Sequence, residues 1–161
     1  RTEVRLVPVD LRHFVHNVVE EIRVGDYDAH CFELHAPGEP APFVTDLNLL
    51  HHIFSNLLSN AVRYSPAGTL VIVRMAEDAS GVQVVVEDHG IGIPPADLTR
   101  IFEPFERGSN VGNIKGTGLG LNIVKRMTEM LGGTIAVSPA QDGGSRFTLV
   151  FPRLTAPAYP S

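Results

Sequence analysis

Residues 56–64 carry polar side chains at a spacing that could bind a metal ion and a phosphate. Asn56, Asn60 and Arg63 are four and then three residues apart, so they share one narrow stripe of a helix. Asparagine is a mediocre helix former, and two of them one turn apart suggest a role other than helix formation. Amide oxygens suit Mg²⁺, which prefers oxygen ligands, while Arg63 would face phosphate and the ring of Tyr64 would line a pocket. The alternative is a solvated stripe, or two buried amides bonded within the protein.

A second candidate segment follows a run of β-branched residues and places a carboxylate beside two glycines. Asp88 stands where the predicted strand gives way to a glycine turn, so the strand end can hold its carboxylate rigidly. Such a carboxylate can accept a hydrogen bond from an exocyclic amine, and Gly90 and Gly92 would let a flat ring approach the backbone. For this segment alone, the alternative is an ordinary Asp-Gly type of turn.

The third candidate segment, residues 115–121, has glycines at alternate positions before a predicted helix. Backbone N–H groups at a helix start, together with the helix dipole, favour an anion such as phosphate, and Lys115 adds a cation. The spacing is not that of a Walker A loop, because no Gly-Lys-Ser/Thr follows a four-residue spacer. It is not the dinucleotide-binding fingerprint either, because Leu121 interrupts the glycine pattern. The alternative is a flexible linker.

The elements that must position these segments are predicted from hydrophobic periodicity and from helix start and stop residues. Helices are expected over residues 11–23, capped by Asp10, over 47–64, stopped by Ser65-Pro66, over 119–131, and in a short candidate at 95–102. Strands are expected over residues 29–34, 42–45, 69–77, 82–87, 134–138 and 145–151. Strands paired through hairpins, with helices long enough to cover one face, predict an α/β two-layer sandwich.

Composition limits the classes of function. The chain has 161 residues, enough for one domain, and a formal net charge of −5 at pH 7. That charge argues against a nucleic-acid module, which needs clustered Lys and Arg. No apolar run reaches the ~18–20 residues that span a bilayer. The one cysteine, Cys31, cannot form an intramolecular disulfide, permits a reducing cytosol, and is expected to be buried in a strand.

In order and spacing, these segments resemble the motif boxes of sensor histidine kinases. Residues 56–64 resemble the N box, 88–93 the first glycine box, 102–105 an F box, 116–121 the second glycine box, and 143–147 the last glycine-containing box. The resemblance extends over about residues 9–152. One box would be weak support, whereas all of them in order make a strong match.

The resemblance implies the Bergerat fold, an α/β (α+β) two-layer sandwich with a mixed, mostly antiparallel sheet and helices on one face. The DNA gyrase B subunit, the MutL mismatch-repair protein and a heat-shock chaperone share this fold. ATP and Mg²⁺ would be bound, with Asn60 as principal metal ligand and Asn56 in support. Both asparagines, with Arg63 (usually lysine in the family) and Lys115 near the phosphates, would be the catalytic residues, and Asp88 would accept from the adenine amino group. The other implied nucleotide contacts are Tyr64, Gly90, Gly92, Ile93, Phe102, Phe105, Gly116, Thr117, Gly118, Leu119, Gly120, Leu121 and Ser145, and residues 105–115 would form the ATP lid.

By the same resemblance, this is the catalytic domain of a cytoplasmic kinase whose parent protein can be membrane-anchored. No histidine here stands in the phosphoacceptor context, His-Glu or His-Asp, so the acceptor would lie on a separate dimerisation and phosphotransfer domain, with a response regulator beyond it. Residues 1–8 are expected to end a linker, 9–152 to form a monomeric domain without nucleic-acid or membrane contact, and 153–161 to form a disordered tail. His89 is expected to point to solvent.

The position one turn before Asn60 separates two enzyme classes of this superfamily. Hydrolases and protein-serine kinases place a glutamate there, whereas this chain has Asn56, whose amide cannot take a proton near neutral pH. A histidine acceptor attacks through a neutral imidazole nitrogen and depends less on such a base. The residues therefore favour transfer to histidine, in two-component signal transduction. A slow ATPase and a non-catalytic nucleotide-binding docking module are the alternatives.

Overall fold

The computed structural model describes residues 3–39, 41–97, 101–103, 117–141 and 143–155. Its main layer is a five-stranded sheet in the order β2-β4-β5-β7-β6. The strands are β2 (Cys31–His35), β4 (Leu70–Asp78), β5 (Gly81–Glu87), β6 (Thr134–Pro139) and β7 (Ser145–Pro152). β2 and β4 run parallel, and the other three neighbouring pairs run antiparallel. The expected mixed, mostly antiparallel sheet is confirmed.

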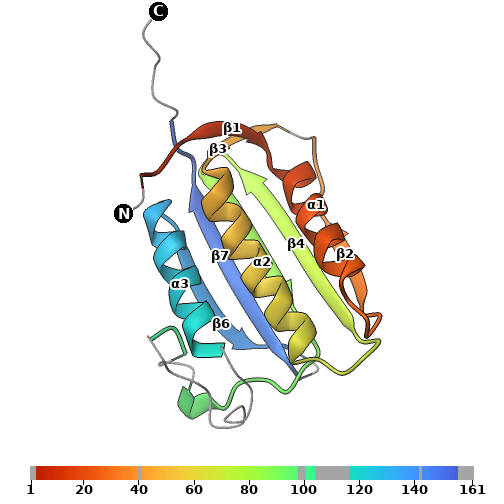
Figure 1. The fold of residues 1–161 in the computed structure, drawn as a ribbon. Helices are drawn as coiled ribbons and strands as arrows, with labels where there is room; N and C mark the ends of the chain where they lie inside the picture. Colours follow the sequence, from red (N-terminus) through yellow and green to blue (C-terminus); the bar gives the residue numbers. More distant parts are fainter. Residues whose placement is uncertain (1–2, 40, 98–100, 104–116, 142, 156–161) are drawn as a thin grey trace, which may run out of the picture.

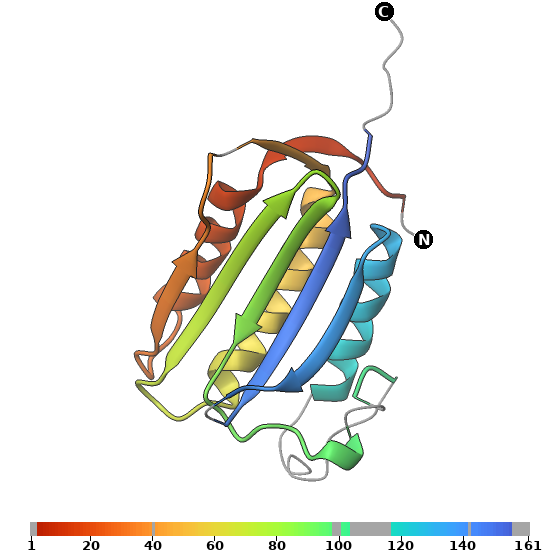
Figure 2. The same ribbon diagram turned by 180° about the vertical axis from the view of Figure 1, so that it is seen from behind.

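The second layer consists of three helices on one face of the sheet (Figure 1). They are α1 (Leu11–Val24), α2 (Leu47–Arg63) and α3 (Thr117–Met130), and α2 lies between the other two. Seen from behind, the opposite face of the sheet has none of the described helices over it (Figure 2). The two-layer arrangement with helices on one face is therefore also confirmed.

The core lies between these layers because the strands send alternate side chains toward the helices. The buried strand residues are Val71, Val73 and Met75 of β4, Val82, Val84 and Val86 of β5, and Phe147, Leu149 and Phe151 of β7. From α2 they meet a wide apolar face of Leu50, Ile53, Phe54, Leu57, Leu58 and Ala61. Each large side chain contributes about 1.5–3 kcal/mol on burial, so this packing fixes how α2 is rotated on the sheet. The rotation in turn fixes where its polar stripe points.

The two ends of the domain extend further than expected. β1 (Val7–Asp10), unpredicted from the sequence, begins inside the expected linker and pairs antiparallel with β3 (Pro42–Thr45) as a separate two-stranded sheet. The pairing that makes residues 7–10 a strand is with a segment distant in sequence, so it is not visible locally. At the other end, Arg153 donates to the carbonyl oxygen of Asp78 and the carboxylate of Glu77, so the expected tail does not begin there. Residues 156–161 lie outside the described residues.

The structure differs from three further predictions about local structure. Of the short helical candidate at 95–102, the structure describes a 3₁₀ helix, η1 (Pro95–Asp97), and a turn at 101–102, while residues 98–100 lie outside the described residues. α3 begins at Thr117, so Gly118 and Gly120 lie in its first turn and not before it. Glycine's low helix propensity predicted a later start, and tertiary packing overrides that preference. Cys31 is exposed on the edge strand β2 and not buried.

Candidate functional site

The candidate segments gather at the end of the sheet where α2 finishes. α2 ends with Tyr64 as its C-cap, and β5 ends at Glu87. Figure 1 places the start of α3 at this same end of the molecule. A Cβ atom added to Gly120 of α3 would lie 3.7 Å from Oδ1 of Asn56, so the two helices approach closely here. The fold thus brings the polar stripe of α2 beside the glycine-bearing start of α3.

Asp88 is held at the end of β5 by backbone groups from two directions. Its Oδ1 accepts from the N–H of Gly90 at 2.9 Å and from that of Ser145 at 3.2 Å, while its own N–H donates to the Ser145 carbonyl at 3.0 Å. The residue is buried, and burial raises the pKa of the carboxyl group even though these N–H groups favour its charge. Among the described residues, both bonds reach Oδ1, which leaves Oδ2 to accept from a ligand.

The neighbouring carboxylate, Glu87, is paired with two guanidinium groups, and its pKa is shifted in the opposite direction to that of Asp88. Arg74 of β4 donates to its Oε1 and Arg146 of β7 to its Oε2. Burial acts to raise the pKa of Glu87, but the two guanidinium groups outweigh it and lower the pKa. Glu87 therefore links β4, β5 and β7 through its two ion pairs. Of the two neighbouring carboxylates, Asp88 is the one that suits a neutral hydrogen-bond donor such as an amine.

The loop after Asp88 has no room for a side chain at residue 90. A Cβ atom on Gly90 would lie 2.3 Å from the carbonyl oxygen of Tyr64, which also accepts from the N–H of Ile91. Gly144 has φ +84°, and its Cβ would lie 2.1 Å from the carbonyl oxygen of Asp88. The sequence predicts only a turn at Gly144. Its close approach to Asp88 depends on how β7 pairs with β5, which the sequence does not show.

We expect Gly144→Ala to destabilise the protein by about 1–3 kcal/mol more than Gly143→Ala, since an overpacked methyl group must displace Asp88. Both glycines have positive φ, but a Cβ on Gly143 meets nothing within 4 Å, so the pair differs in the contact alone. The measurement is urea unfolding of both variants. Equal loss of stability in the two would show that the approach to Asp88 does not matter.

The two asparagines of α2 have different surroundings. The Nδ2 of Asn56 donates to the His52 carbonyl at 2.9 Å, which leaves its Oδ1 toward α3. The Nδ2 of Asn60 is buried and has no partner among the described residues. A buried polar group without a partner is rare and costs about 1–3 kcal/mol, so it points to a group that a ligand completes. At the helix end, the guanidinium of Arg63 lies 5.9 Å from the centre of the Tyr64 ring.

Comparisons with known proteins agree with this arrangement. Residues 45–155 match the family model described as histidine kinase-, DNA gyrase B-, and HSP90-like ATPase. The chain belongs to this family. It is 42% identical to the sensor-like histidine kinase SenX3 of Mycobacterium tuberculosis, over 68% of this chain and 27% of that protein. It is 35% identical to the histidine-protein kinase/phosphatase MprB of Mycobacterium leprae, over 84% and 26% respectively. The chain thus spans about a quarter of the length of these curated relatives.

The solved structures that resemble this chain identify it as the ATP-binding catalytic domain of a sensor histidine kinase. The mycobacterial sensor histidine kinase MprB superposes with a TM-score of 0.80 at 32% identity, covering 91% of this chain and 98% of that one. Full-length ShkA, solved in complex with AMPPNP, has a TM-score of 0.82 at 30% identity, covering 98% of this chain and 33% of that one. This domain, a HATPase (histidine kinase-like ATPase) domain, therefore has the fold that the motif boxes implied.

Several of the predicted contact residues of the HATPase domain belong to its packing. The ring of Phe102 packs edge-on against Phe147 at 6.3 Å, Leu121 is buried, and Ile93 packs against the core. Gly92 has φ +73°, as a tight turn requires. Thr117, Gly118, Leu119 and Gly120 form the first turn of α3. Phe105, Lys115, Gly116 and the expected lid, residues 105–115, lie outside the described residues.

The expectation that His89 points to solvent was wrong. Its Nδ1 lies 2.9 Å from the carbonyl oxygen of Leu70, and the side chain is half-buried. The cause is register: β4 and β5 pair Ile72 with Glu87, and continuing that antiparallel register places residue 89 opposite residue 70. His89 thus fastens the loop after β5 to the start of β4.

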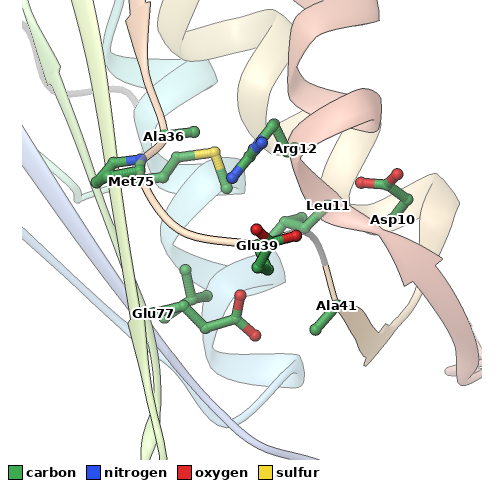
Figure 3. A pocket seen from close by; sticks show the side chains of 10 residues that line it. Asp10, Leu11, Arg12, Ala36, Glu39, Ala41, Met75 and Glu77 are labelled. Atoms are coloured by element: carbon green, nitrogen blue, oxygen red, sulfur yellow. The ribbon is translucent and has the colours of Figure 1, made fainter.

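A pocket at the other end of the HATPase domain is too small for a nucleotide. It lies beside the start of α1, with Arg12, Glu39 and Met75 among its lining residues (Figure 3). Its volume is about 20 Å³, which is room for about one water molecule. It adjoins the β4–β5 turn, at the opposite end of β5 from Asp88.

Among the described residues, none of the helices is both long and apolar enough to cross a bilayer.

Proposed function

We propose that the chain binds ATP with Mg²⁺ and transfers the γ-phosphoryl group to a histidine on a separate domain. The observation that carries the proposal is the Asp88 carboxylate, which the N–H groups of Gly90 and Ser145 hold at the end of β5. A fixed carboxylate accepts from the amino group of adenine and repels the carbonyl oxygen that guanine presents in its place. Membership of the family and the AMPPNP complex of the relative ShkA support a nucleotide as the ligand.

The phosphate end of the proposed site is formed by α2 and the start of α3. Asn60, with Asn56 in support, would hold Mg²⁺ through amide oxygens, the ligand type that this ion prefers. The buried Nδ2 of Asn60, without a partner among the described residues, can donate to a phosphate oxygen, and the Oδ1 of Asn56 lies near the start of α3 at Gly120. When bound, the ion supplies positive charge that neutralises the phosphates. The N–H groups and dipole of α3, together with Arg63, would add to it.

A histidine acceptor fits this site better than water because the helix that carries Asn56 and Asn60 has no carboxylate base. α2 contains no Asp or Glu, and the amide of Asn56 is bonded to the His52 carbonyl. In the proposed transfer, an imidazole nitrogen of the acceptor bonds to the γ-phosphorus, the bond to the β,γ-bridging oxygen breaks, and ADP leaves. The imidazole proton passes to water. Catalysis then depends on positioning and charge neutralisation.

The rest of the proposal concerns the parent protein. The acceptor histidine would lie on the parent's dimerisation and phosphotransfer domain, and a response regulator would receive the phosphoryl group from it. The relatives that support this are sensor histidine kinases several times longer than this chain. Because ATP is the substrate, we place the domain in the cytoplasm.

We expect the isolated chain to bind ATP without labelling itself, because its histidines lack the phosphoacceptor context. Incubation with γ-labelled ATP should give acid-labile label only after a family phosphoacceptor domain is added, and only on that domain. The control is the same acceptor domain with its acceptor histidine changed to glutamine. Label accumulating on this chain alone, above all at His13 or His16, contradicts the proposal. Rapid ATP hydrolysis without the acceptor domain would favour the ATPase alternative.

A further inference from the structure

A buried ion pair lies in the loop between α1 and β2. The Nδ1 of His30 is 3.1 Å and 3.0 Å from the two carboxylate oxygens of Asp26, and the His30 N–H donates to Oδ2 at 2.6 Å. The two side chains are 0% and 2% exposed. The N–H of Asp28 also donates to Asp26. A charged pair removed from water this completely costs desolvation energy, which the fold must recover through these bonds.

The second ring nitrogen of His30 also faces an acceptor. Its Nε2 lies 3.1 Å from the carbonyl oxygen of Ser65, which can only accept. Since the carboxylate of Asp26 also only accepts, both ring nitrogens must donate, and a neutral ring would leave one lone pair facing an oxygen. Burial opposes the charge, but the bonds to Ser65 and Asp26 and the charges of Asp26 and Asp28 raise the pKa of His30.

The carbonyl group that His30 holds belongs to the turn that supports the adenine end of the site. Ser65 directly follows Tyr64, whose carbonyl oxygen accepts from Ile91 and abuts Gly90. The same turn is bonded to the His30 loop twice more, by Gly68 N–H to the Asp28 carbonyl and by Cys31 N–H to the Thr69 carbonyl. The turn after α2 therefore lies between the α1–β2 loop and the loop that follows Asp88, with hydrogen bonds to both.

We propose that protonated His30, held by Asp26, is a positioning residue for the nucleotide site, acting through the Ser65 carbonyl on the Tyr64 turn and the Gly90 loop. The inference rests on the proposed nucleotide-binding function. Loss of the proton removes one donor, either from Ser65 or from Asp26, and weakens the attachment of the turn on which the loop after Asp88 packs, leaving its two backbone bonds to the His30 loop. Nucleotide affinity therefore depends on the charge of a histidine that does not touch the nucleotide.

The direction in which ATP affinity changes with pH follows from the pKa of His30. Because the pKa of His30 in the folded protein lies above its ordinary value of 6.5, its contribution is fully present below pH 6.5 and is lost as pH rises through the folded pKa. ATP affinity should fall with it, by about fivefold or more. Linkage is reciprocal, so bound nucleotide must raise the pKa of His30 in turn.

The test compares ATP affinity between about pH 6 and pH 9 for the wild type, Asp26→Asn and His51→Gln. Asp26→Asn removes the charge that holds the proton, so its loss of affinity should begin at lower pH. His51 is the control, because it makes a similar 3.0 Å bond to Glu21 with both side chains about half exposed. His51→Gln should follow the wild type at every pH. Titration of the nucleotide phosphates affects all three proteins alike, so it cancels when Asp26→Asn is compared with the wild type.

A second measurement needs no variant and so does not depend on Asp26→Asn folding. NMR titration of the wild-type His30 ring nitrogens should find both protonated at pH 7, with a pKa that rises when ATP is added. A neutral ring at pH 7, or a pKa unchanged by ATP, overturns the inference. If Asp26→Asn has the same pH profile of ATP affinity as the wild type and His51→Gln, the inference is overturned as well and the proposed function stands. Absence of ATP binding at every pH overturns both.

Discussion

Asp88→Asn is expected to weaken ATP binding about 5- to 150-fold, the scale of a mispaired buried hydrogen bond of about 1–3 kcal/mol. The asparagine can still accept from Gly90 and Ser145 through its oxygen, so the loop should keep its shape. Its NH₂ group then replaces the second carboxylate oxygen and meets the adenine amino group donor to donor. The measurement is calorimetric titration with ATP and GTP.

The same substitution should not destabilise the protein at pH 7. Burial raises the pKa of Asp88, so the folded state binds the proton more tightly than the unfolded state. Stability therefore falls as pH rises from the ordinary aspartate pKa of 3.8 through the folded pKa, and above that window the charged carboxylate costs free energy. Asparagine avoids this cost, so Asp88→Asn should be at least as stable as the wild type at pH 7. Lower affinity with equal or greater stability identifies a binding residue.

Asp78→Asn is the matched control for Asp88→Asn. Asp78 also accepts from a backbone N–H two residues ahead, that of Ser80 at 2.9 Å, but it lies at the other end of the β4–β5 hairpin. Its substitution should leave ATP affinity unchanged. Wild-type protein that binds ATP and GTP equally well, or an Asp88→Asn variant within twofold of wild type, would contradict the role given to Asp88.

The candidate residues of the site could be chosen from the sequence, whereas the contacts that support them could not. Asp88 and Asn60 could be singled out because a strand end and a helix stripe are local features. The contact of Gly144 with Asp88 could not, since it requires β7 to pair with β5 at the register that aligns Glu87 with Arg146. A strand's sequence specifies which face is buried but not which strand lies beside it.

The His30 pair was missed for the same physical reason. Asp26 and His30 lie in a loop, where a four-residue spacing has no periodic meaning, and Ser65 is 35 residues further along the chain. The fold class was predictable because apolar periods of two and 3.6 residues are strong signals. The strand order β2-β4-β5-β7-β6 was not, since it is set by packing between distant segments.

The second large effect is expected at Asn60. Asn60→Ala should lower phosphoryl transfer to an added acceptor domain by about 10²–10³-fold, as the loss of a charge-stabilising group does in other enzymes. Asn60→Asp keeps an oxygen that can ligate Mg²⁺ but adds a negative charge beside the phosphates, so transfer should fall further than binding. Both quantities must be measured on the same protein. A parallel loss of binding and transfer in Asn60→Asp would mean that Asn60 does not position the phosphates.

Asn56 decides between the two enzyme classes. Asn56→Glu introduces a group that can take a proton one turn before Asn60, on a helix that otherwise contains no carboxylate. We expect it to lower the ratio of histidine transfer to ATP hydrolysis, because water gains a base and the imidazole acceptor does not need one. Asn56→Gln is the control: it has the length of glutamate and, like it, loses the bond geometry to the His52 carbonyl, but it cannot take a proton. If both variants shift the ratio equally, the effect is steric. If wild-type protein already hydrolyses ATP quickly without the acceptor domain, Asn56 does not set the class, and the ATPase alternative replaces the kinase.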